Sequence, residues 1–438
     1  MEKIVNVIGA GLAGCEAAYQ LSKRGIAVCL YEMKPKKYSP AHHSDNFAEI
    51  VCSNSLKSEE KSTASGTLKD ELEVLDSLLL KIAKRCKVPA GSALAVDREQ
   101  FSSLVTEEIK KLDNVTIINE EVVNIDITKP TIIATGPLTS NELSNSIFEL
   151  LGDKSLYFFD ASAPIVEADS INYEKTFTSG RYGKGESDYI NCPMNKDEYY
   201  TFISELKNAK RVELKDFENT EVFEGCMPVE VMASRGDDTL RFGPLRPVGL
   251  RDNDGNRPFA VVQLRRENTK SELYNIVGFQ TNLLFSEQKR VFSLIPALEN
   301  AEFIKFGVMH RNTFINAPKH LNSDFSMKKY PFIYFAGQLS GVEGYVESIA
   351  SGLIAGLSMT NKLKGKEFVP LDSTTIIGAL CKHISTETVN YQPMNANFGI
   401  LPELHEKIRD KALKKQAYSE RAVRDMKEFK EKLENDRI

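Results

Sequence analysis

The first 32 residues follow an order that few folds can accommodate: an apolar run, a glycine turn, a helix and a second apolar run that ends in an acid. The run at residues 4–8 leads into Gly9-x-Gly11-x-x-Gly14, helical spacing continues to residue 23, and the run at 26–31 ends at Glu32. This is the βαβ unit of a dinucleotide-binding site. We expect Gly9 to permit the turn, Gly11 to admit a pyrophosphate and Gly14 to let the helix pack on the strand. Glu32 would accept hydrogen bonds from ribose hydroxyls.

Two later segments indicate whether the dinucleotide is NAD or FAD. Residues 131–136 and 332–338 are apolar runs that end in small residues, at Thr135-Gly136 and Gly337-Gln338. A turn with Gly341 follows, and then a helix of small residues that starts near Tyr345 and could point its N-terminus at a flavin or a phosphate. Two distant returns to one nucleotide favour a discontinuous FAD domain; the alternative is that both segments are plain sheet strands.

The length of 438 residues predicts two or three domains. We expect an α/β fold in which residues 1–150 and 330–438 form a Rossmann-like FAD-binding domain. Residues 151–329 change to short strands with frequent turns, and they predict an inserted α/β domain. A charged helical tail at 406–437 fits a solvated surface about as well as an RNA-facing one.

Composition excludes several classes of protein. Hydrophobic residues make up 42% and charged residues 27%, which excludes a disordered or fibrous chain, and the net charge of −5 does not by itself indicate nucleic acid. No apolar run reaches the roughly 18 residues of a membrane span, and the N-terminus leaves no room for a signal peptide, so a cytoplasmic protein is predicted. The seven cysteines have no CxxC spacing, which predicts reduced thiols, and no catalytic metal site is expected.

Two cysteines have neighbours that suit chemistry. Cys226 lies between a glycine and a Met-Pro pair that force an irregular turn, and Cys52 lies among Ser and Asn donors able to stabilise a thiolate. A thiolate is the strongest nucleophile among protein side chains. The alternative for each is a small buried hydrophobic residue, the usual place of a cysteine.

Arginines and histidines supply further candidates. Seven arginines, at positions 235, 241, 246, 251, 257, 265 and 266, suit phosphate contacts and base stacking, or else ordinary surface ion pairs. Arg265 is one of these candidates for RNA contact. His42 and His43 precede the Cys52 segment, and His310 stands next to Arg311; such histidines protonate or stack on substrates, although a structural histidine is more common.

Together these segments resemble one family, the folate- and FAD-dependent tRNA (uracil-5)-methyltransferases. The resemblance runs from the first strand to about residue 401. It is carried by the glycine turn with Glu32 and by the blocks PAHH at 40–43, VCSNSL at 51–56, VPAG at 88–91, EGCMP at 224–228, GVMHRNTFIN at 307–316, GVEGYVES at 341–348 and QPMNANFG at 392–399.

The resemblance implies 5-methyluridine formation in RNA. FAD, reduced by NADH or NADPH, would take the one-carbon unit of 5,10-methylenetetrahydrofolate and deliver it with reducing equivalents to C5 of a uridine. Cys226 matches the nucleophile that adds to C6, and Cys52 matches a second cysteine that acts as base or protects the flavin adduct. The sequence leaves open which cysteine does which. His43 or His310 would stack on the pterin or flavin, and Arg311 and Arg265 would contact substrate.

Three other readings stay open. The T-loop uridine of tRNA is the favoured target, but residues 56–66 are more charged and serine-rich than the family pattern, so a uridine of 23S ribosomal RNA is the alternative. An NAD(P)H oxidase or folate oxidoreductase would need neither cysteine. The related flavoprotein that builds carboxymethylaminomethyl groups on wobble uridine would require a protein partner, whereas none is inferred from this sequence.

Overall fold

The computed structural model describes residues 4–153, 156–179, 181, 188–212, 227–388 and 391–435, with the backbone alone of 156–160, 310, 311 and 435. The strands are β1 (Ile4–Ile8), β2 (Ala27–Tyr31), β3 (Ser55–Ser58), β4 (Lys87–Val88), β5 (Ala93–Val96), β6 (Val115–Ile118), β7 (Thr131–Ile133), β8 (Leu156–Ala161), β9 (Ile165–Glu167), β10 (Phe177–Thr178), β11 (Tyr189–Met194), β12 (Ala260–Arg266), β13 (Leu273–Ile276), β14 (Phe303–Lys305), β15 (Met309–Phe314) and β16 (Ile333–Phe335).

The α-helices are α1 (Leu12–Ser22), α2 (Ala64–Val74), α3 (Leu78–Arg85), α4 (Arg98–Lys110), α5 (Asn141–Leu151), α6 (Lys196–Asn208), α7 (Val229–Ser234), α8 (Thr239–Phe242), α9 (Phe285–Phe292), α10 (Ala317–His320), α11 (Tyr345–Leu363), α12 (Ile376–His383) and α13 (Lys411–Asn435). Short 3₁₀ helices are η1 (Ala168–Ser170), η2 (Tyr173–Lys175), η6 (Pro296–Leu298), η7 (Gln338–Ser340) and η8 (Phe398–Ile400).

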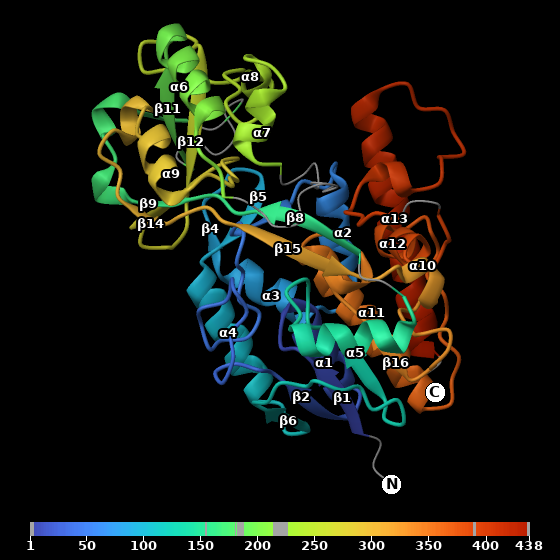
Figure 1. Cartoon of the computed structure of the whole chain (residues 1–438). Coiled ribbons are helices and arrows are strands. Elements are labelled where there is room, and N and C mark those ends of the chain that lie inside the picture. Colours follow the sequence, from blue (N-terminus) through green and yellow to red (C-terminus); the bar gives the residue numbers. More distant parts are fainter. Residues whose placement is uncertain are drawn as a thin grey trace.

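A five-stranded parallel sheet with the order β16-β7-β1-β2-β6 forms the base of the molecule (Figure 1). Its strands are mostly apolar, as is typical of a parallel sheet that helices cover. The helix α1 packs against α11, so closely that a β-carbon at Gly352 would lie 2.1 Å from the Ala13 carbonyl oxygen. The predicted α/β class, with both later strands β7 and β16 returning to the sheet of β1, is confirmed.

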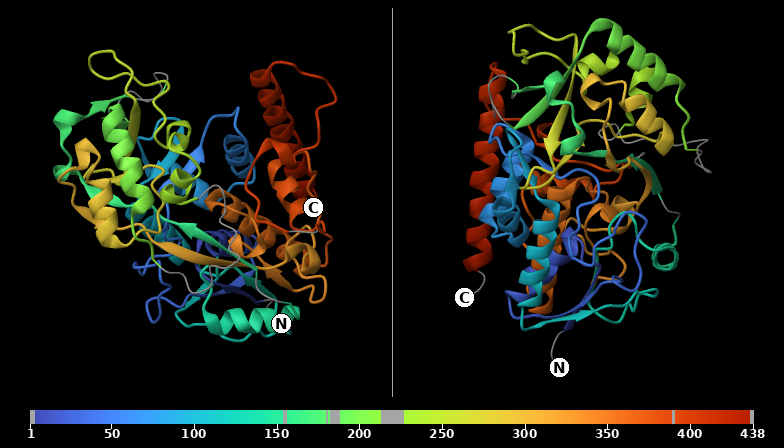
Figure 2. Two further views of the ribbon diagram at one scale, coloured as in Figure 1. Left: turned by 45° about the horizontal axis from the view of Figure 1, so that its top comes forward. Right: turned by 90° about the vertical axis from the view of Figure 1, so that its left-hand side faces the viewer.

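The second part of the molecule is built on a six-stranded sheet with the order β10-β11-β12-β13-β9-β14 (Figure 1). Its hydrophobic core draws on residues between 163 and 303, while the larger core draws on residues between 5 and 151 and between 314 and 433. The antiparallel pair β8 and β15 runs between the two parts, as both views of Figure 2 allow the reader to follow.

The division into 1–150 with 330–438 and 151–329 stays a prediction. Phe314, Leu321 and Phe325 lie in the larger core, although they precede residue 330. Their packing favours an earlier return of the chain to the first domain.

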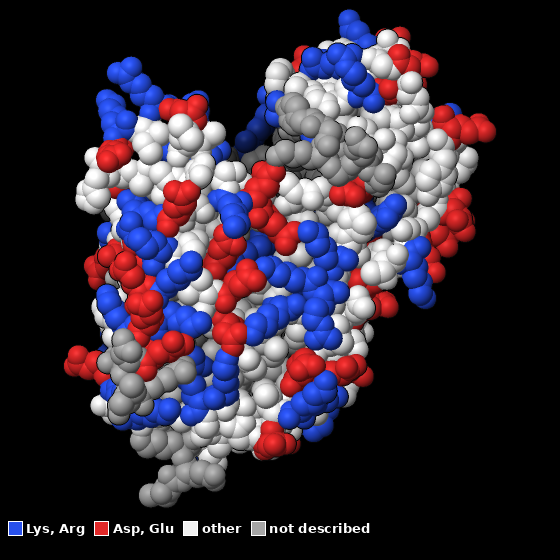
Figure 3. Space-filling view, turned by 180° about the vertical axis from the view of Figure 1, so that it is seen from behind, with Lys and Arg blue, Asp and Glu red and all other residues white. Residues whose placement is uncertain are grey.

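The long helix α13 lies along the outer side of α2 (Figure 1). Tyr418, Met426 and Phe429 bury one face of it, and Thr67 donates a hydrogen bond to the Ser419 hydroxyl at 2.9 Å. The charged residues of the tail therefore occupy the remaining, exposed face. Seen from behind, the molecule carries Lys and Arg interspersed with Asp and Glu, and its surface is hollowed between the lobe of α13 and the inserted domain (Figure 3).

Within the described part of the chain, the helices are too short or too polar to cross a bilayer.

Candidate active site

A large cavity opens at the carboxyl ends of β1, β2, β7 and β16, where parallel sheets place their ligands. It encloses about 1140 Å³ of space, counting its open mouth. Of the ten cofactor residues that the sequence predicts, eight line it: Gly9, Gly11, Glu32, Thr135, Gly136, Gly337, Gln338 and Tyr345. The sheet thus brings together four segments, of which the first and the last are more than 300 residues apart in the chain.

The glycine turn forms the floor of the cavity. Gly9 has φ +96°, and a β-carbon there would lie 2.7 Å from the Ala134 carbonyl oxygen. Gly14 lies outside the cavity and serves packing, because a β-carbon there would lie 1.8 Å from the Gly9 carbonyl oxygen. A β-carbon at Gly11 would meet only the Ala134 oxygen, at 4.0 Å, so that position faces open space in the cavity.

Glu32 is fixed at the end of β2. One carboxylate oxygen accepts the Ala10 N–H at 2.9 Å, and the other accepts the Lys34 N–H at 3.0 Å. The side chain is buried but still lines the cavity. Two backbone bonds leave each oxygen a free lone pair, so the carboxylate can accept ribose hydroxyls.

The second wall of the cavity comes from the segment after β16. Gly337 and Gln338 line it, and the Gln338 amide donates to the Glu343 carboxylate at 2.6 Å. Gly341 does not line it: a β-carbon there would lie 2.2 Å from the Tyr391 hydroxyl oxygen, so this glycine admits Tyr391 rather than a cofactor.

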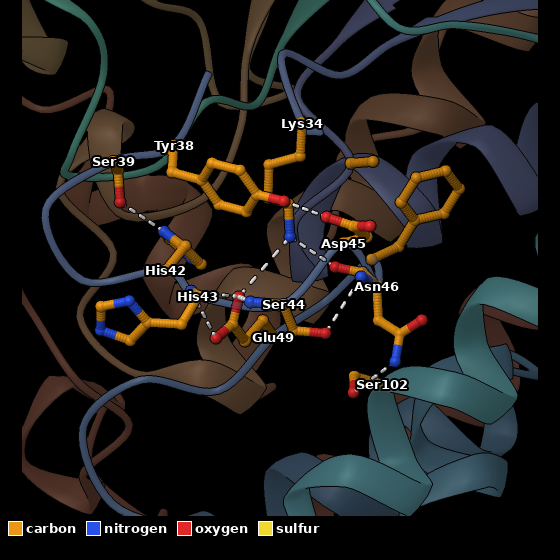
Figure 4. Close-up of polar contacts among 12 residues, drawn as sticks. Lys34, Tyr38, Ser39, His42, His43, Ser44, Asp45, Asn46, Glu49 and Ser102 are labelled. Carbon is orange, nitrogen blue, oxygen red and sulfur yellow. Dashed lines mark hydrogen bonds and ion pairs between the residues drawn. The ribbon is translucent and has the colours of Figure 1, made fainter. Parts of the chain in front are cut away.

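The loop after β2 closes one side of the cavity (Figure 4). Lys34, Ser39, His42 and Glu49 line it, and the His42 ring contacts the Ser39 hydroxyl at 2.5 Å. His43, the predicted stacking residue, is exposed and outside the lining; its backbone N–H donates to the Glu49 carboxylate at 3.0 Å. Of two adjacent histidines, the loop turns His42 toward the cavity.

Cys52 lies at the edge of this cavity, directly after the lining residue Val51. Its backbone N–H donates to the hydroxyl of Tyr345 at 2.9 Å, and its sulfur contacts the Ala161 carbonyl oxygen at 3.9 Å. The cysteine is half-buried. Two of the predicted site residues, Cys52 and Tyr345, are therefore neighbours.

Cys226 lies outside the described residues, and so do the side chains of His310 and Arg311, whose backbone belongs to β15. The chain is described again from Met227. The Val229 N–H donates to the Gln280 carbonyl at 2.7 Å, and the residue after Gln280, Thr281, donates its N–H to the Ser162 carbonyl at 3.3 Å. Ser162 follows Ala161, which Cys52 contacts. Val229 is thus connected through these hydrogen bonds to the backbone that the Cys52 sulfur contacts.

Arg265 contacts the segment that carries Cys52. Its guanidinium donates to the Asn54 side chain at 3.0 Å and to the Ser53 hydroxyl at 2.7 Å, and only 6% of the residue is exposed. These hydrogen bonds hold the Cys52 loop. The burial of Arg265 does not favour the contact with RNA, which stays a prediction.

The other buried cysteines are held as thiols. Burial raises the pKa of Cys15, Cys192 and Cys381 well above the ordinary value, and it raises the pKa of Cys86 to about 11. A protonated thiol is a weak nucleophile. The six cysteines that the structure describes form no disulfide with one another. No group of three or more His, Cys, Asp or Glu side chains within the described ranges is arranged to hold a metal ion.

Known proteins resemble this chain over nearly its whole length. The family model of glucose inhibited division protein A matches residues 4–367. A methylenetetrahydrofolate–tRNA-(uracil-5-)-methyltransferase TrmFO of Acetivibrio thermocellus is 56% identical over 427 residues, covering 97% of this chain and 98% of the relative. The protein of the same name from Halalkalibacterium halodurans is 53% identical over 431 residues, covering 98% and 99%.

Among solved structures, GidA of Aquifex aeolicus superposes with a TM-score of 0.70 at 16% identity, covering 98% of this chain and 74% of that one. At that identity the likeness shows the fold.

Proposed function

Since the chain belongs to the glucose inhibited division protein A family, and within it to the methylenetetrahydrofolate–tRNA-(uracil-5-)-methyltransferases, we propose that it forms 5-methyluridine in the T-loop of tRNA. The carbon donor is 5,10-methylenetetrahydrofolate. The observation that carries the proposal is the position of Cys52, half-buried beside Tyr345 at the edge of the dinucleotide cavity.

The residues of the cavity fit FAD. Gly9 and Gly11 leave room for a pyrophosphate at the N-terminus of α1, where backbone N–H groups attract anions. Glu32 offers carboxylate lone pairs to a ribose, and Tyr345 begins α11, whose N-terminus is directed at the far end of the cavity. FAD, when bound, supplies a carrier for the one-carbon unit and the electrons that turn it into a methyl group. We take those electrons to come from NADH or NADPH.

The two cysteines have separate tasks in this proposal. The Cys226 thiolate adds to C6 of the uridine, which makes C5 an enamine-like carbon able to attack the one-carbon unit. Loss of the C5 proton would release the one-carbon unit from its carrier and leave a methylene group on C5. A hydride equivalent, which reduced FAD would supply when bound, would convert this group to methyl as the C6–S bond breaks and the Cys226 thiolate is restored. Cys52, at the cavity edge, is the residue we propose as the base that takes the C5 proton. The uridine must leave its base stack to reach the cavity, at a cost of a few kcal/mol. His310 and Arg311 stay proposed substrate contacts, on the strength of the GVMHRNTFIN block alone.

The curated relatives are named for tRNA, which favours tRNA over ribosomal RNA as the substrate. The presence of Cys52 beside the cavity favours methyl transfer over a plain NAD(P)H oxidase, which has no use for a thiol there.

The test supplies the purified protein with 5,10-methylenetetrahydrofolate labelled in its one-carbon unit, NADH, an unmodified tRNA transcript and fragments of 23S ribosomal RNA. We expect label in the T-loop of the tRNA. Label in the ribosomal fragments alone would show that the substrate is ribosomal RNA and not tRNA. NADH consumption without labelled RNA would overturn the proposal in favour of an oxidase.

A further inference from the structure

Three consecutive backbone carbonyls around Cys52 each accept a hydrogen bond from a cationic side chain. The Arg98 guanidinium donates to the Ile50 oxygen at 2.9 Å and to the Cys52 oxygen at 2.7 Å. The Lys305 ammonium donates to the Val51 oxygen at 3.3 Å. Ordinary loops leave such carbonyls to water or to backbone N–H groups, so a loop bound by two cations is an unusual arrangement.

The two cations come from different parts of the fold. Arg98 is the first residue of α4, and Lys305 is the last residue of β14 in the six-stranded sheet. Glu267, just after β12, binds the Arg98 guanidinium at 2.5 and 3.3 Å and is buried. Through this ion pair the inserted domain fixes the arginine that holds the Cys52 loop.

The charges around Cys52 are mostly positive. Among the side chains that the structure describes there, Arg98 and Lys305 face the loop as cations, and buried Arg265 approaches from Ser53. Glu267 and Glu49 are the nearby carboxylates, and the Tyr345 hydroxyl accepts the hydrogen bond from the Cys52 N–H. Burial lowers the pKa of Lys305, and the neighbouring Arg98 lowers it further, while negative charge at Glu267, Glu49 and Cys52 acts in the opposite direction. By reciprocity these cations favour negative charge on the sulfur.

We propose that Arg98 and Lys305 are positioning residues that hold the backbone of residues 50–52 at the domain junction and place positive charge beside Cys52. The inference rests on the proposed function for the chemical task of Cys52, since a base for the C5 proton must be a thiolate. The geometry of the loop and the charge on the sulfur can be tested without RNA or folate.

The first experiment measures how fast iodoacetamide alkylates Cys52 at different pH values, by mass spectrometry of the Cys52 peptide from protein purified with FAD. The variant Lys305→Met keeps a long side chain and removes the charge. We expect its alkylation at pH 7 to be about tenfold slower and its pH profile to move up by about one unit. Lys175→Met is the matched control, because Lys175 forms a surface ion pair with Glu299 at 2.9 Å in the same domain. Its profile should coincide with that of the native protein.

The second variant separates geometry from charge. Arg98→Lys keeps the positive charge but cannot bind both carbonyls, so we expect a nearly unchanged alkylation profile and a lower kcat for methyl transfer at unchanged KM for tRNA. Alkylation profiles of Lys305→Met and native protein that superimpose, together with native kcat in Arg98→Lys, would overturn the inference. Full methylation by Cys52→Ser, with the Lys305→Met profile still shifted, would instead remove Cys52 from the proposed chemistry and leave the positioning role standing.

Discussion

The hydroxyl of Tyr345 accepts a hydrogen bond from the Cys52 backbone N–H at 2.9 Å, joining residues that are 293 positions apart in the chain. Tyr345 is the first residue of α11 and lines the cavity, while Cys52 belongs to a loop held by Arg98 from the start of α4. The bond therefore connects Tyr345, in the wall of the proposed FAD site, to the backbone of Cys52, the proposed base. A cofactor bound against Tyr345 and the backbone of Cys52 would then have a fixed mutual position.

The variant Tyr345→Phe tests this tie, since it keeps the ring and removes the acceptor. One lost hydrogen bond of about 1 kcal/mol predicts a fall in kcat of roughly fivefold, with FAD content unchanged. Methylation assays and visible absorbance of the purified protein measure the two quantities. Tyr334→Phe is the matched control, because it removes a buried hydroxyl that contacts Ser358 outside the cavity lining. A native kcat in Tyr345→Phe would show that the bond does not position Cys52.

The glycine turn makes a second prediction. A side chain at Gly11 has room in the folded protein but fills the place of the pyrophosphate. Gly11→Val should therefore fold normally and be purified without FAD, and Gly11→Ala should retain part of it. Circular dichroism reports the fold, and the visible spectrum reports the flavin. A fully loaded, yellow Gly11→Val protein would contradict the placement of the pyrophosphate.

The positions of these glycines show how much of the site can be read from sequence. Gly9, Gly14 and Glu32 belong to one continuous stretch, so local geometry and the period of the apolar residues determine their relation. The later strands β7 and β16 were predictable for the same reason, because a short apolar run that ends in glycine has few other uses. These elements give the α/β fold and most of the cavity lining.

The surroundings of Cys52 could not be predicted in this way. Arg98 and Lys305 stand in no motif, and only the packing of α4 and β14 brings them to one loop. Arg265 was assigned to RNA because its residue type suits phosphate, but burial is a property of the assembled fold and not of the residue. His42 and His43 are adjacent, and only the path of the loop decides which one faces the cavity.

Lys69 makes stability depend on pH. Burial lowers its pKa to about 8, although its ammonium donates to the Ser58 carbonyl at 2.9 Å and to the Ser65 hydroxyl at 2.8 Å. Because the folded pKa lies below that of the unfolded chain, the unfolded state binds more protons between about pH 8 and 10.5, so stability should rise with pH across that window. The expected gain is about 3 kcal/mol.

Urea unfolding at several pH values across this window measures that gain. Lys69→Met should flatten the rise, while Lys84→Met, which loses only a surface ion pair with Glu73, should keep it. An equal rise in the native protein and in Lys69→Met would assign the pH dependence to other groups.

Cys226→Ala is the sharpest test of the chemistry, because it removes the proposed nucleophile and nothing that lines the described cavity. Without a thiolate to add at C6, C5 does not become nucleophilic, so methyl transfer should fall by at least about a thousandfold. Bound FAD and its reduction by NADH should persist, as stopped-flow absorbance would record. Cys192→Ala is the matched control: Cys192 is fully buried in β11, and burial raises the pKa of its thiol, so its loss should leave methylation near the native rate. Undiminished RNA methylation by Cys226→Ala would exclude this cysteine from the reaction and would transfer the role of nucleophile to Cys52, the half-buried thiol at the cavity edge.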